Sequence, residues 1–389
     1  MQLKNPDHKG TEFFASLEGM RGIAALGVVF YHVEWHWHLY GLEIVRNGRL
    51  FVDLFFIISG FVISHIYAAR LNSPRALAEF AVLRTARLYP LHFFTLLLIA
   101  GITLSMPWLT AHWSALPADD PRLRENTLNQ FLQNLFLVHA LVPGHHFSFN
   151  RPSWSISVEY FTYFLFAILA VLTFGRKSLM VAASALVAGA SVLYLWHRGA
   201  LTVNISLLRC FTGFFIGVLL QFLWQRVHSG AREMLEHGWK AHIAETLCLA
   251  LIIAAMTYGG HRHAQFLVLP AFALGVWLFS LSHGWVTRVL ESRWIQNLGK
   301  WSYSIYMVHF SLLLVATDTL RVATRIGDTA RHVRLNVWEV DAVGATFIAL
   351  VLIMSSLTYR FIEVPPRTLA KHWVARWKMR EPAGTISSP

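Results

Sequence analysis

The sequence predicts an all-α polytopic integral membrane protein with about ten transmembrane helices. Of its 389 residues, 55% are hydrophobic and only 14% are charged, and the mean hydropathy is +0.47. A soluble domain carries about 25% charged residues. The net charge of +12 does not indicate a nucleic-acid partner, because the basic residues stand in short clusters between apolar segments. Cys210 and Cys248 lie in apolar runs, so no disulfide framework is expected.

Ten apolar segments approach the ~20 residues that a helix needs to cross a bilayer. They are 18–38, 51–69, 89–106, 155–174, 179–196, 203–223, 242–258, 264–282, 302–320 and 340–361. We expect 1–380 to form a single transmembrane domain, followed by a short polar tail at 381–389. The first apolar segment lacks a small-residue cleavage site, which predicts a retained helix rather than a signal peptide.

Lysine positions predict the orientation of these helices. An even number of helices places both termini on one side of the membrane, and every lysine then falls on that side. The lysines are Lys4, Lys9, Lys177, Lys240, Lys300, Lys371 and Lys378. Arginines are less decisive, since Arg321, Arg325, Arg331 and Arg334 fall on the opposite side. Because cytoplasmic loops are enriched in basic residues, we expect both termini to be cytoplasmic.

The longest segment between the expected helices, 107–153, is placed on the outer face. Its apolar run 131–142 is too short to cross the membrane, so this run either lies in the interface or re-enters the helix bundle. A long structured loop of this kind is often a lid or a binding element.

The first apolar segment carries Arg21 near its start and His32 near its end. At about 100° per residue both side chains lie on one face of a helix, roughly 16 Å apart. Small residues between them, including Gly22 and Gly27, would let neighbouring helices approach closely. Ionisable side chains inside a membrane helix usually mark function. The alternative is that both residues anchor the helix at the two interfaces.

Other charged residues lie near the second and third helices. Asp53 is expected at a depth similar to that of His32, and its alternative role is a helix-start carboxylate. Ser59-Gly60 fits a packing notch better than a nucleophile. Arg84 and Arg87 share a face if this stretch is helical. They could bind a phosphate-bearing ligand, but spacing alone favours cytoplasmic anchors.

Two later helices carry stripes of polar residues. Ser155, Glu159 and Tyr163 lie on one stripe of the fourth helix, and Glu159 needs a partner inside the apolar segment. Its candidate partners are Arg21, Arg151 and His32. The ninth helix carries Ser302, Tyr306 and His309 on one side, with Tyr303 beside them. The last helix is expected to stop at Pro365 and Pro366.

Three pairs of histidines do not predict a metal site. They stand at expected outer helix ends or loops, without an HExxH or CxxC pattern. The pairs are His36 and His38, His145 and His146, and His261 and His263. Interfacial imidazoles explain them, so no metal is expected.

Taken in order, these motifs resemble the acyltransferase family 3 membrane proteins, which O-acylate sugars and other acceptors at bacterial surfaces. Six pieces carry the resemblance over most of the chain. They are LEGMRGIAALGVVFYH (17–32), VDLFFIISGF (52–61), RTARLYP (84–90), WSISVEYFTYF (154–164), LGKWSYSIYMVH (298–309) and the closing Glu363-Val-Pro. The resemblance implies a ten-helix acyltransferase core in the bacterial cytoplasmic (inner) membrane. Some family members carry an additional extracytoplasmic hydrolase-like domain, and the length of this chain leads us to expect none.

The resemblance also implies the chemistry. Acyl-CoA would be the co-substrate, with no bound cofactor, and its anionic nucleotide end would contact Arg84, Arg87 and Arg21. A histidine at the position of His32 is the implied catalytic base, taking a proton from an acceptor hydroxyl as it attacks the thioester. An acyl-histidine intermediate also fits.

Supporting residues are expected around this base. Asp53 or Glu159 would orient the His32 ring as a carboxylate does in a triad, and the sequence does not decide between them. Ser302, Tyr303, Tyr306 and His309 would line the acyl pocket or support the oxyanion.

The acceptor is expected to be a carbohydrate or glycoconjugate outside the cytoplasm, and acetyl is the expected acyl group. Aromatic residues of the outer segment could stack on sugar faces or form an interfacial belt; they are Trp108, Trp113, Phe147 and Phe149. The competing function is a transporter of a small anion or glycan precursor, which would also use Arg and His inside a bundle. Against it, the sequence shows no repeated half and no matched pair of broken helices.

Overall fold

The computed structural model is all-helical. It describes residues 13–35, 37–113, 116, 120–141, 147–173, 175–199, 201, 205–235, 238–281, 283–324 and 335–379, and no β-strand occurs among them. The α-helices are α1 (Ala15–His32), α2 (Glu43–Arg46), α3 (Phe51–Tyr67), α4 (Pro74–His112), α5 (Pro121–Glu125), α6 (Leu128–Leu135), α7 (Trp154–Leu172), α8 (Lys177–Arg198), α9 (Ser206–Leu235), α10 (Trp239–Tyr258), α11 (Val268–Phe279), α12 (Trp285–Leu290), α13 (Arg293–Thr324), α14 (Val337–Thr358) and α15 (Val364–Met379). The 3₁₀ turns are His38–Gly41, Gly48–Leu50, Arg151–Ser153 and Ala264–Leu267, and Tyr359–Glu363 is a π-helical turn. The tail at 381–389 lies outside the described residues.

The prediction of a polytopic membrane protein is confirmed. Eight helices among the described residues are long and apolar enough to cross a membrane. Two of the ten expected spans do not reach that standard. The first is α1, which carries Glu18, Arg21 and His32 within 18 residues. The other is the shorter apolar stretch Ala264–Phe279, which contains α11.

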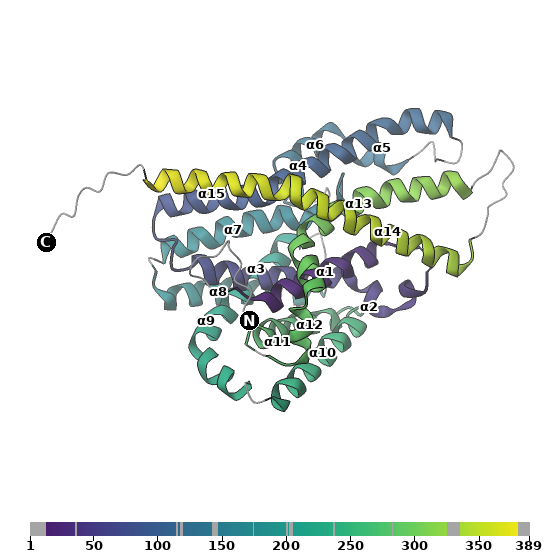
Figure 1. The fold of residues 1–389 in the computed structure, drawn as a ribbon. Helices are drawn as coiled ribbons and strands as arrows, with labels where there is room; N and C mark the ends of the chain where they lie inside the picture. The colour runs from purple at the N-terminus through teal and green to yellow at the C-terminus, as the bar shows by residue number, and fades with distance from the viewer. Residues whose placement is uncertain are drawn as a thin grey trace.

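Helix α1 lies in the middle of the bundle and packs mainly on α13 and α3, while α3 packs on α9 (Figure 1). Glycines allow these close approaches, as the sequence predicts. Gly22 of α1 faces the backbone of Leu298 and Gly299 on α13, and Gly60 of α3 faces the backbone of Phe214 on α9. A side chain at either glycine would push two helix backbones apart, so both fix the spacing of the bundle.

The first expected span ends earlier than predicted. Helix α1 stops at His32, and the chain then turns so that Val33 and Trp37 are buried. The Trp37 ring lies against Gly344 of α14. The apolar residues after His32 therefore cover a neighbouring helix instead of extending α1, and neither Gly nor Pro marks the boundary.

The third span begins 15 residues before the predicted start, since α4 runs from Pro74 rather than from residue 89. Ser73 caps the helix by accepting a hydrogen bond from the Ala76 N–H, and Pro74 occupies the first turn, where its missing N–H is not needed. Pro90 and Pro107 are accommodated inside the helix. Arg84 and Arg87 are consequently helical and share a face.

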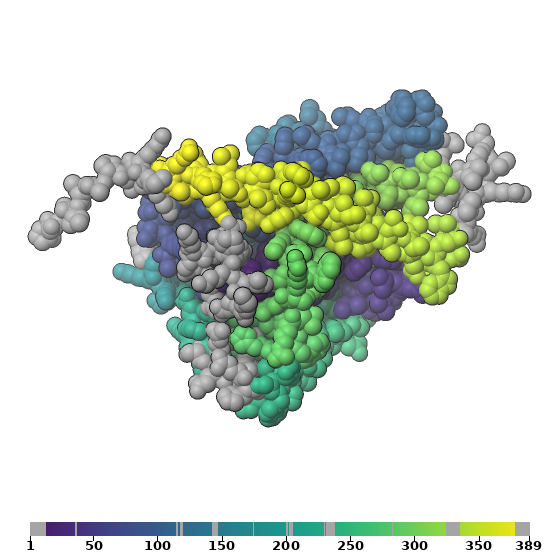
Figure 2. Space-filling view, in the orientation of Figure 1, coloured from purple at the N-terminus to yellow at the C-terminus, as the bar shows by residue number. Residues whose placement is uncertain are grey.

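The last span does not stop at Pro365 and Pro366. Helix α14 continues through the π-helical turn Tyr359–Glu363 directly into α15, and together they form a continuous band across the molecule (Figure 2). The π-helical turn ends where the Val364 N–H donates to the Tyr359 carbonyl, and the two prolines fall in the first turn of α15.

The outer segment packs into the protein. It contains α5 and α6, and Leu137 and Ala140 beyond them are buried. The Tyr89 hydroxyl donates to the Leu135 carbonyl at 3.0 Å, and the Ser157 hydroxyl donates to the Leu137 carbonyl. Of the two alternatives for the run 131–142, entry into the bundle fits this burial, although residue 142 lies outside the described residues.

Replacing Gly60 by Ala tests the α3–α9 contact. The added methyl group collides with the Phe214 backbone, which cannot move as a side chain can, so we expect a loss of about 1–3 kcal/mol of stability. Gly189→Ala in α8 is the matched control, because its added Cβ has no atom within 4 Å. Thermal unfolding in detergent should show a lower melting temperature for Gly60→Ala alone; equal melting of both variants would contradict the packing described.

Candidate active site

Two cavities lie inside the bundle. The first, of about 380 Å³, is lined by Arg21, Arg84 and Arg87 among others and is called here the arginine cavity. The second, of about 740 Å³, is lined by His32 among others and is called the histidine cavity. Arg21 and His32, on one face of α1, therefore open into two different cavities.

The same four helices line both cavities at successive levels. Into the arginine cavity, α1, α3, α7 and α13 place Arg21, Ser59, Glu159 and Tyr303, respectively. Into the histidine cavity, the same four helices place His32, Val52, Trp154 and Tyr306. The two tyrosines are three residues apart, an axial rise of about 4.5 Å. The cavities are thus neighbours divided by a thin wall of side chains.

Hydrogen bonds to backbone carbonyls hold this wall. The Tyr303 hydroxyl donates to the Leu88 carbonyl of α4 at 2.6 Å. The Tyr306 hydroxyl donates to the Pro152 carbonyl at 2.9 Å and lies 2.7 Å from Ser155 Oγ. The Phe55 ring meets Tyr306 edge-on, with centroids 5.8 Å apart.

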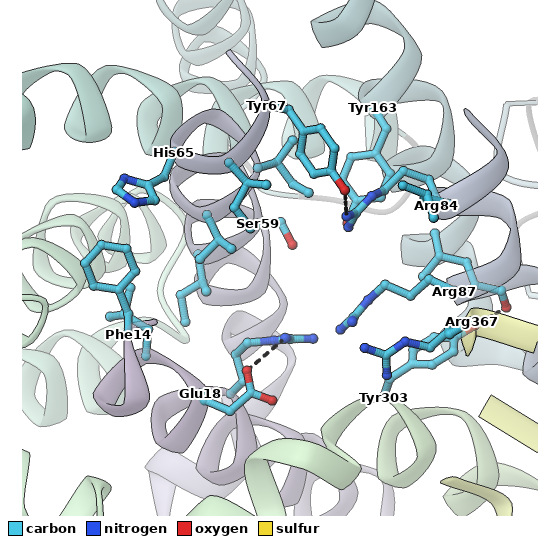
Figure 3. Close-up of a pocket in the computed structure, with 18 of the residues that line it drawn as sticks. Phe14, Glu18, Ser59, His65, Tyr67, Arg84, Arg87, Tyr163, Tyr303 and Arg367 are labelled. Atoms are coloured by element: carbon cyan, nitrogen blue, oxygen red, sulfur yellow. Dashed lines mark hydrogen bonds and ion pairs between the residues drawn. The ribbon is translucent and has the colours of Figure 1, made fainter. Parts of the chain in front are cut away.

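The arginine cavity has a strong excess of positive charge. Two acidic residues line it, Glu18 and Glu159, against seven basic ones. The basic residues are Arg21, Arg70, Arg84, Arg87, Lys300, Arg367 and Lys371. Arg84, Arg87 and Arg367 point inward from one side, and Phe14 and His65 lie opposite (Figure 3). A cavity of this composition suits a ligand with several negative charges and an apolar or aromatic part.

Arg84 is held by aromatic rings. Its Nη2 donates to the Tyr67 hydroxyl at 2.9 Å. Its guanidinium lies over the rings of Tyr67, Phe80 and Tyr163, with its central carbon 5.0, 5.6 and 5.9 Å from their centroids. Such stacking fixes the plane of the guanidinium while leaving donors for a ligand.

Two buried carboxylates lie near the arginine cavity. Glu159 accepts hydrogen bonds from Ser59 Oγ at 2.5 Å and from the Tyr163 hydroxyl at 2.6 Å. Glu363 accepts from Ser304 Oγ at 3.1 Å and from Arg367 Nη1 at 3.0 Å. The stripe that the sequence predicts on α7 therefore contains one real pair, Glu159 with Tyr163. Ser59 is the second partner of this carboxylate, beyond the candidates that the sequence suggests.

His32 is paired with a second histidine. Its Nδ1 lies 2.9 Å from the Val28 carbonyl and 3.2 Å from His309 Nε2, while His309 Nδ1 lies 3.0 Å from the Ile305 carbonyl. Carbonyl oxygens only accept, so each Nδ1 carries the hydrogen, and the lone pair of His309 Nε2 faces the His32 N–H. By elimination the lone pair of neutral His32 is on Nε2, the position that a general base needs.

Neither expected carboxylate orients this ring. Asp53 is fully buried and forms a bidentate pair with Arg209 of α9, at 2.9 Å to Nε and 2.7 Å to Nη2. Glu159 makes its hydrogen bonds with Ser59 and Tyr163. Asp53 instead contributes to the wall of the histidine cavity through Arg209, which it holds in place. Arg209 lines this cavity, and its guanidinium carbon lies 5.3 Å from the centroid of the Trp154 ring.

Sequence reasoning missed Arg209, Arg367 and the pairing of His309 with His32. Arg209 had a usable signal, since it is a lone arginine inside an apolar span. Arg367 follows the prolines that were expected to end the last helix. The contact between His309 and His32 joins residues 277 positions apart and has no local signal.

The residues expected to line one acyl pocket lie in different places in the structure. Tyr303 lines the arginine cavity, and Tyr306 lines the histidine cavity. His309 lies behind His32, and Ser302 is buried outside both lining sets. Within the described ranges, no group of three or more His, Cys, Asp or Glu side chains could hold a metal ion. His36, His145 and His146 lie outside those ranges.

Comparison with known proteins finds relatives that are named as O-acetyltransferases. The peptidoglycan O-acetyltransferase OatA of Listeria monocytogenes is 22% identical over 94% of this chain and 57% of its own length. A putative peptidoglycan O-acetyltransferase of Bacillus subtilis is also 22% identical, over 95% of this chain and 56% of its own length. A putative O-acetyltransferase of Staphylococcus aureus is 22% identical, over 92% of this chain and 58% of its own length. The chain thus spans a little under three fifths of these relatives. No solved structure matches it.

A family model described as an acyltransferase domain matches residues 14–358, which include the four helices shared by both cavities. The chain therefore belongs to acyltransferase family 3.

Proposed function

We propose that this protein transfers an acyl group, most simply acetyl, from cytoplasmic acyl-CoA to a hydroxyl of a carbohydrate or glycoconjugate outside the cytoplasm. One observation carries the proposal: four helices line a strongly basic cavity and, beyond a thin wall, a cavity with a histidine positioned as a base. The peptidoglycan O-acetyltransferases among the relatives support the choice of acetyl and of a glycan. The family match supports 1–380 as a single acyltransferase domain.

The arginine cavity is the proposed donor site. The phosphates of CoA would be bound by Arg84, Arg87 and Arg21, the residues that the sequence suggests, together with Arg367. Lys300 and Lys371 line the same cavity, which supports a cytoplasmic position for it and for both termini. From Arg21 to His32 is about 16 Å along α1, a span that the long pantetheine arm of CoA could bridge.

The histidine cavity is the proposed acceptor site. His32 Nε2 takes the proton of the acceptor hydroxyl as the oxygen attacks the thioester carbonyl. The new C–O bond forms, the C–S bond breaks, and the proton passes from His32 to the departing CoA sulfur. His309 holds the His32 tautomer in the role for which Asp53 or Glu159 was expected.

The two carboxylates keep supporting roles in this proposal. Asp53 positions Arg209 and, through it, Trp154 in the wall of the acceptor site. Glu159 positions Ser59 and Tyr163 at the arginine cavity, on the donor side. Tyr303 and Tyr306 form the passage through which the acyl group crosses from one cavity to the other.

Removing the base should abolish turnover. We expect His32→Ala to lower the consumption of radiolabelled acetyl-CoA by about 10²- to 10⁴-fold, the usual contribution of a general base. The assay uses purified protein in nanodiscs and follows thiol release and any label retained on the protein. Membrane insertion should match the wild type, because the substitution places an apolar residue in α1, whereas the melting temperature should fall modestly because the buried His309 Nε2 loses its partner. Full activity in this variant would refute the assignment.

Removing the donor contacts should weaken acetyl-CoA binding. We expect Arg84→Ala and Arg87→Ala each to raise the KM for acetyl-CoA by about tenfold or more, through loss of charge-assisted hydrogen bonds. Arg75→Ala is the control on the same helix, because Arg75 pairs with Glu79 and the Trp377 carbonyl outside the cavity. An unchanged KM in both cavity variants would place the donor elsewhere.

Removing the second histidine should slow the chemical step without weakening donor binding. We expect His309→Leu to lower kcat by about tenfold or more at an unchanged KM for acetyl-CoA, because the His32 N–H keeps only the Val28 carbonyl as an acceptor and loses its contact with His309 Nε2. His309→Gln offers a carbonyl oxygen at a similar reach and should restore part of the rate. If Gln and Leu are equally slow, or if Leu is fully active, His309 does not act through His32.

A further inference from the structure

Charged side chains also line the histidine cavity, but there they are nearly balanced. Five arginines face four acidic residues. The arginines are Arg49, Arg122, Arg151, Arg209 and Arg321, and the acids are Glu34, Asp120, Glu125 and Asp318. This balance contrasts with the seven basic and two acidic residues of the arginine cavity.

Most of these arginines are paired with carboxylates. Arg122 binds Asp120 and Asp318, each at 2.7 Å, and Arg321 lies 3.7 Å from Asp318. Arg151 pairs with Glu125 at 3.3 Å, and Arg209 pairs with Asp53. Glu34 is exposed, so water solvates it. After these pairs are formed, Arg49 is the arginine left over.

Arg49 is half-buried, and the carboxylate nearest to it in the fold is already occupied. Asp53 lies one helical turn further along the chain, and Arg209 binds both of its oxygens, at 2.9 and 2.7 Å. Arg209 Nη2 also donates to the Arg49 carbonyl at 2.9 Å, which fixes the backbone there. Throughout the described part of the chain, no residue forms a hydrogen bond or an ion pair with the Arg49 guanidinium. Two guanidinium groups therefore flank one carboxylate, leaving one positive charge uncompensated.

Arg49 lines the same cavity as the proposed base. Gly48, beside Arg49, packs against the Gly27 carbonyl and the Tyr31 side chain of α1. The Tyr31 ring in turn meets the His32 ring edge-on, with centroids 5.0 Å apart. Tyr31, His32 and Arg49 all line the histidine cavity.

We propose that Arg49 binds an acidic group of the acceptor, a carboxylate or a phosphate, so that the acceptor is an anionic glycan. This inference rests on the proposed function of the histidine cavity as the acceptor site. A partly buried cation without a protein partner is costly, and a planar guanidinium pairs with carboxylate or phosphate through two parallel hydrogen bonds. Anchoring the acid at Arg49 directs a hydroxyl of the same sugar chain toward His32.

Matched monosaccharides test the proposal by direct binding. Galactose, galacturonate and galactose 6-phosphate are titrated against full-length protein in nanodiscs and followed by saturation-transfer NMR. We expect wild-type protein to bind at least one acidic sugar about tenfold more tightly than galactose. The two acidic probes show whether the site prefers a carboxylate or a phosphate.

Variants assign the preference to Arg49. Arg49→Gln should bind the acidic and neutral sugars equally, and Arg49→Lys should keep part of the preference. Arg46→Gln is the matched control and should retain all of it, because Arg46 is exposed, pairs with Glu43 and lies outside the cavity. Equal binding of all three sugars to the wild type, no saturable binding of any, or a preference that survives in Arg49→Gln overturns the proposal.

Acetyl-CoA turnover, measured in the wild type and in His32→Ala, separates this inference from the proposed function. Turnover without any preference for acidic sugars would leave the acyltransfer proposal standing and remove the Arg49 subsite. A preference that depends on Arg49 in a protein that does not consume acetyl-CoA would remove the acyltransfer proposal and leave an anion-binding subsite.

Discussion

A charged side chain inside a membrane bundle must be paired or must face a hydrated cavity, and this constraint organises the structure. The bidentate Asp53–Arg209 pair satisfies it by complete burial, tying α3 to α9 and supporting Trp154. Arg84 satisfies it by stacking on aromatic rings at the edge of the arginine cavity. Breaking one partner of such a buried pair leaves an uncompensated charge, which costs far more than the pair contributes. Many of the other charged side chains line the two cavities, among them the paired residues Arg122, Asp120 and Asp318.

Much of the fold follows from sequence because hydrophobic length and helical periodicity are local properties. The stripe that joins Arg21 to His32, and the close approaches at Gly22 and Gly60, need only the spacing of residues on a helix. The ends of helices are harder, since tertiary packing decides them. Trp37 turns the chain away after His32 to cover Gly344, and a π-helical turn carries α14 past its prolines.

Several candidate residues of the site can be identified from the sequence, but which of them contact one another cannot. Arg21 and His32 stand out because charged or titratable groups are rare in apolar segments, whereas Arg84 and Arg87 precede the expected third span and become candidates through the family resemblance. Which groups touch depends on helices far apart in the chain, as with His309 and His32 or Asp53 and Arg209. A sequence pattern suggests that a carboxylate should orient the base, because carboxylates do so elsewhere. In this bundle Asp53 neutralises Arg209, and in the proposed mechanism the neutral His309 imidazole takes the place of a carboxylate.

The contrast in charge between the two cavities gives the proposed transfer a direction. The excess of positive charge in the arginine cavity favours a ligand with several negative charges such as CoA, whereas the balanced histidine cavity, with Arg49 as its one unpaired arginine, suits a single acidic group of the acceptor. Only the acyl end of the donor then needs to pass the wall at Tyr303 and Tyr306, which is about one helical turn thick. Because hydrogen bonds to Leu88 and Pro152 hold these tyrosines, the passage stays narrow. The thioester can meet the acceptor at His32 while the nucleotide remains bound on the other side.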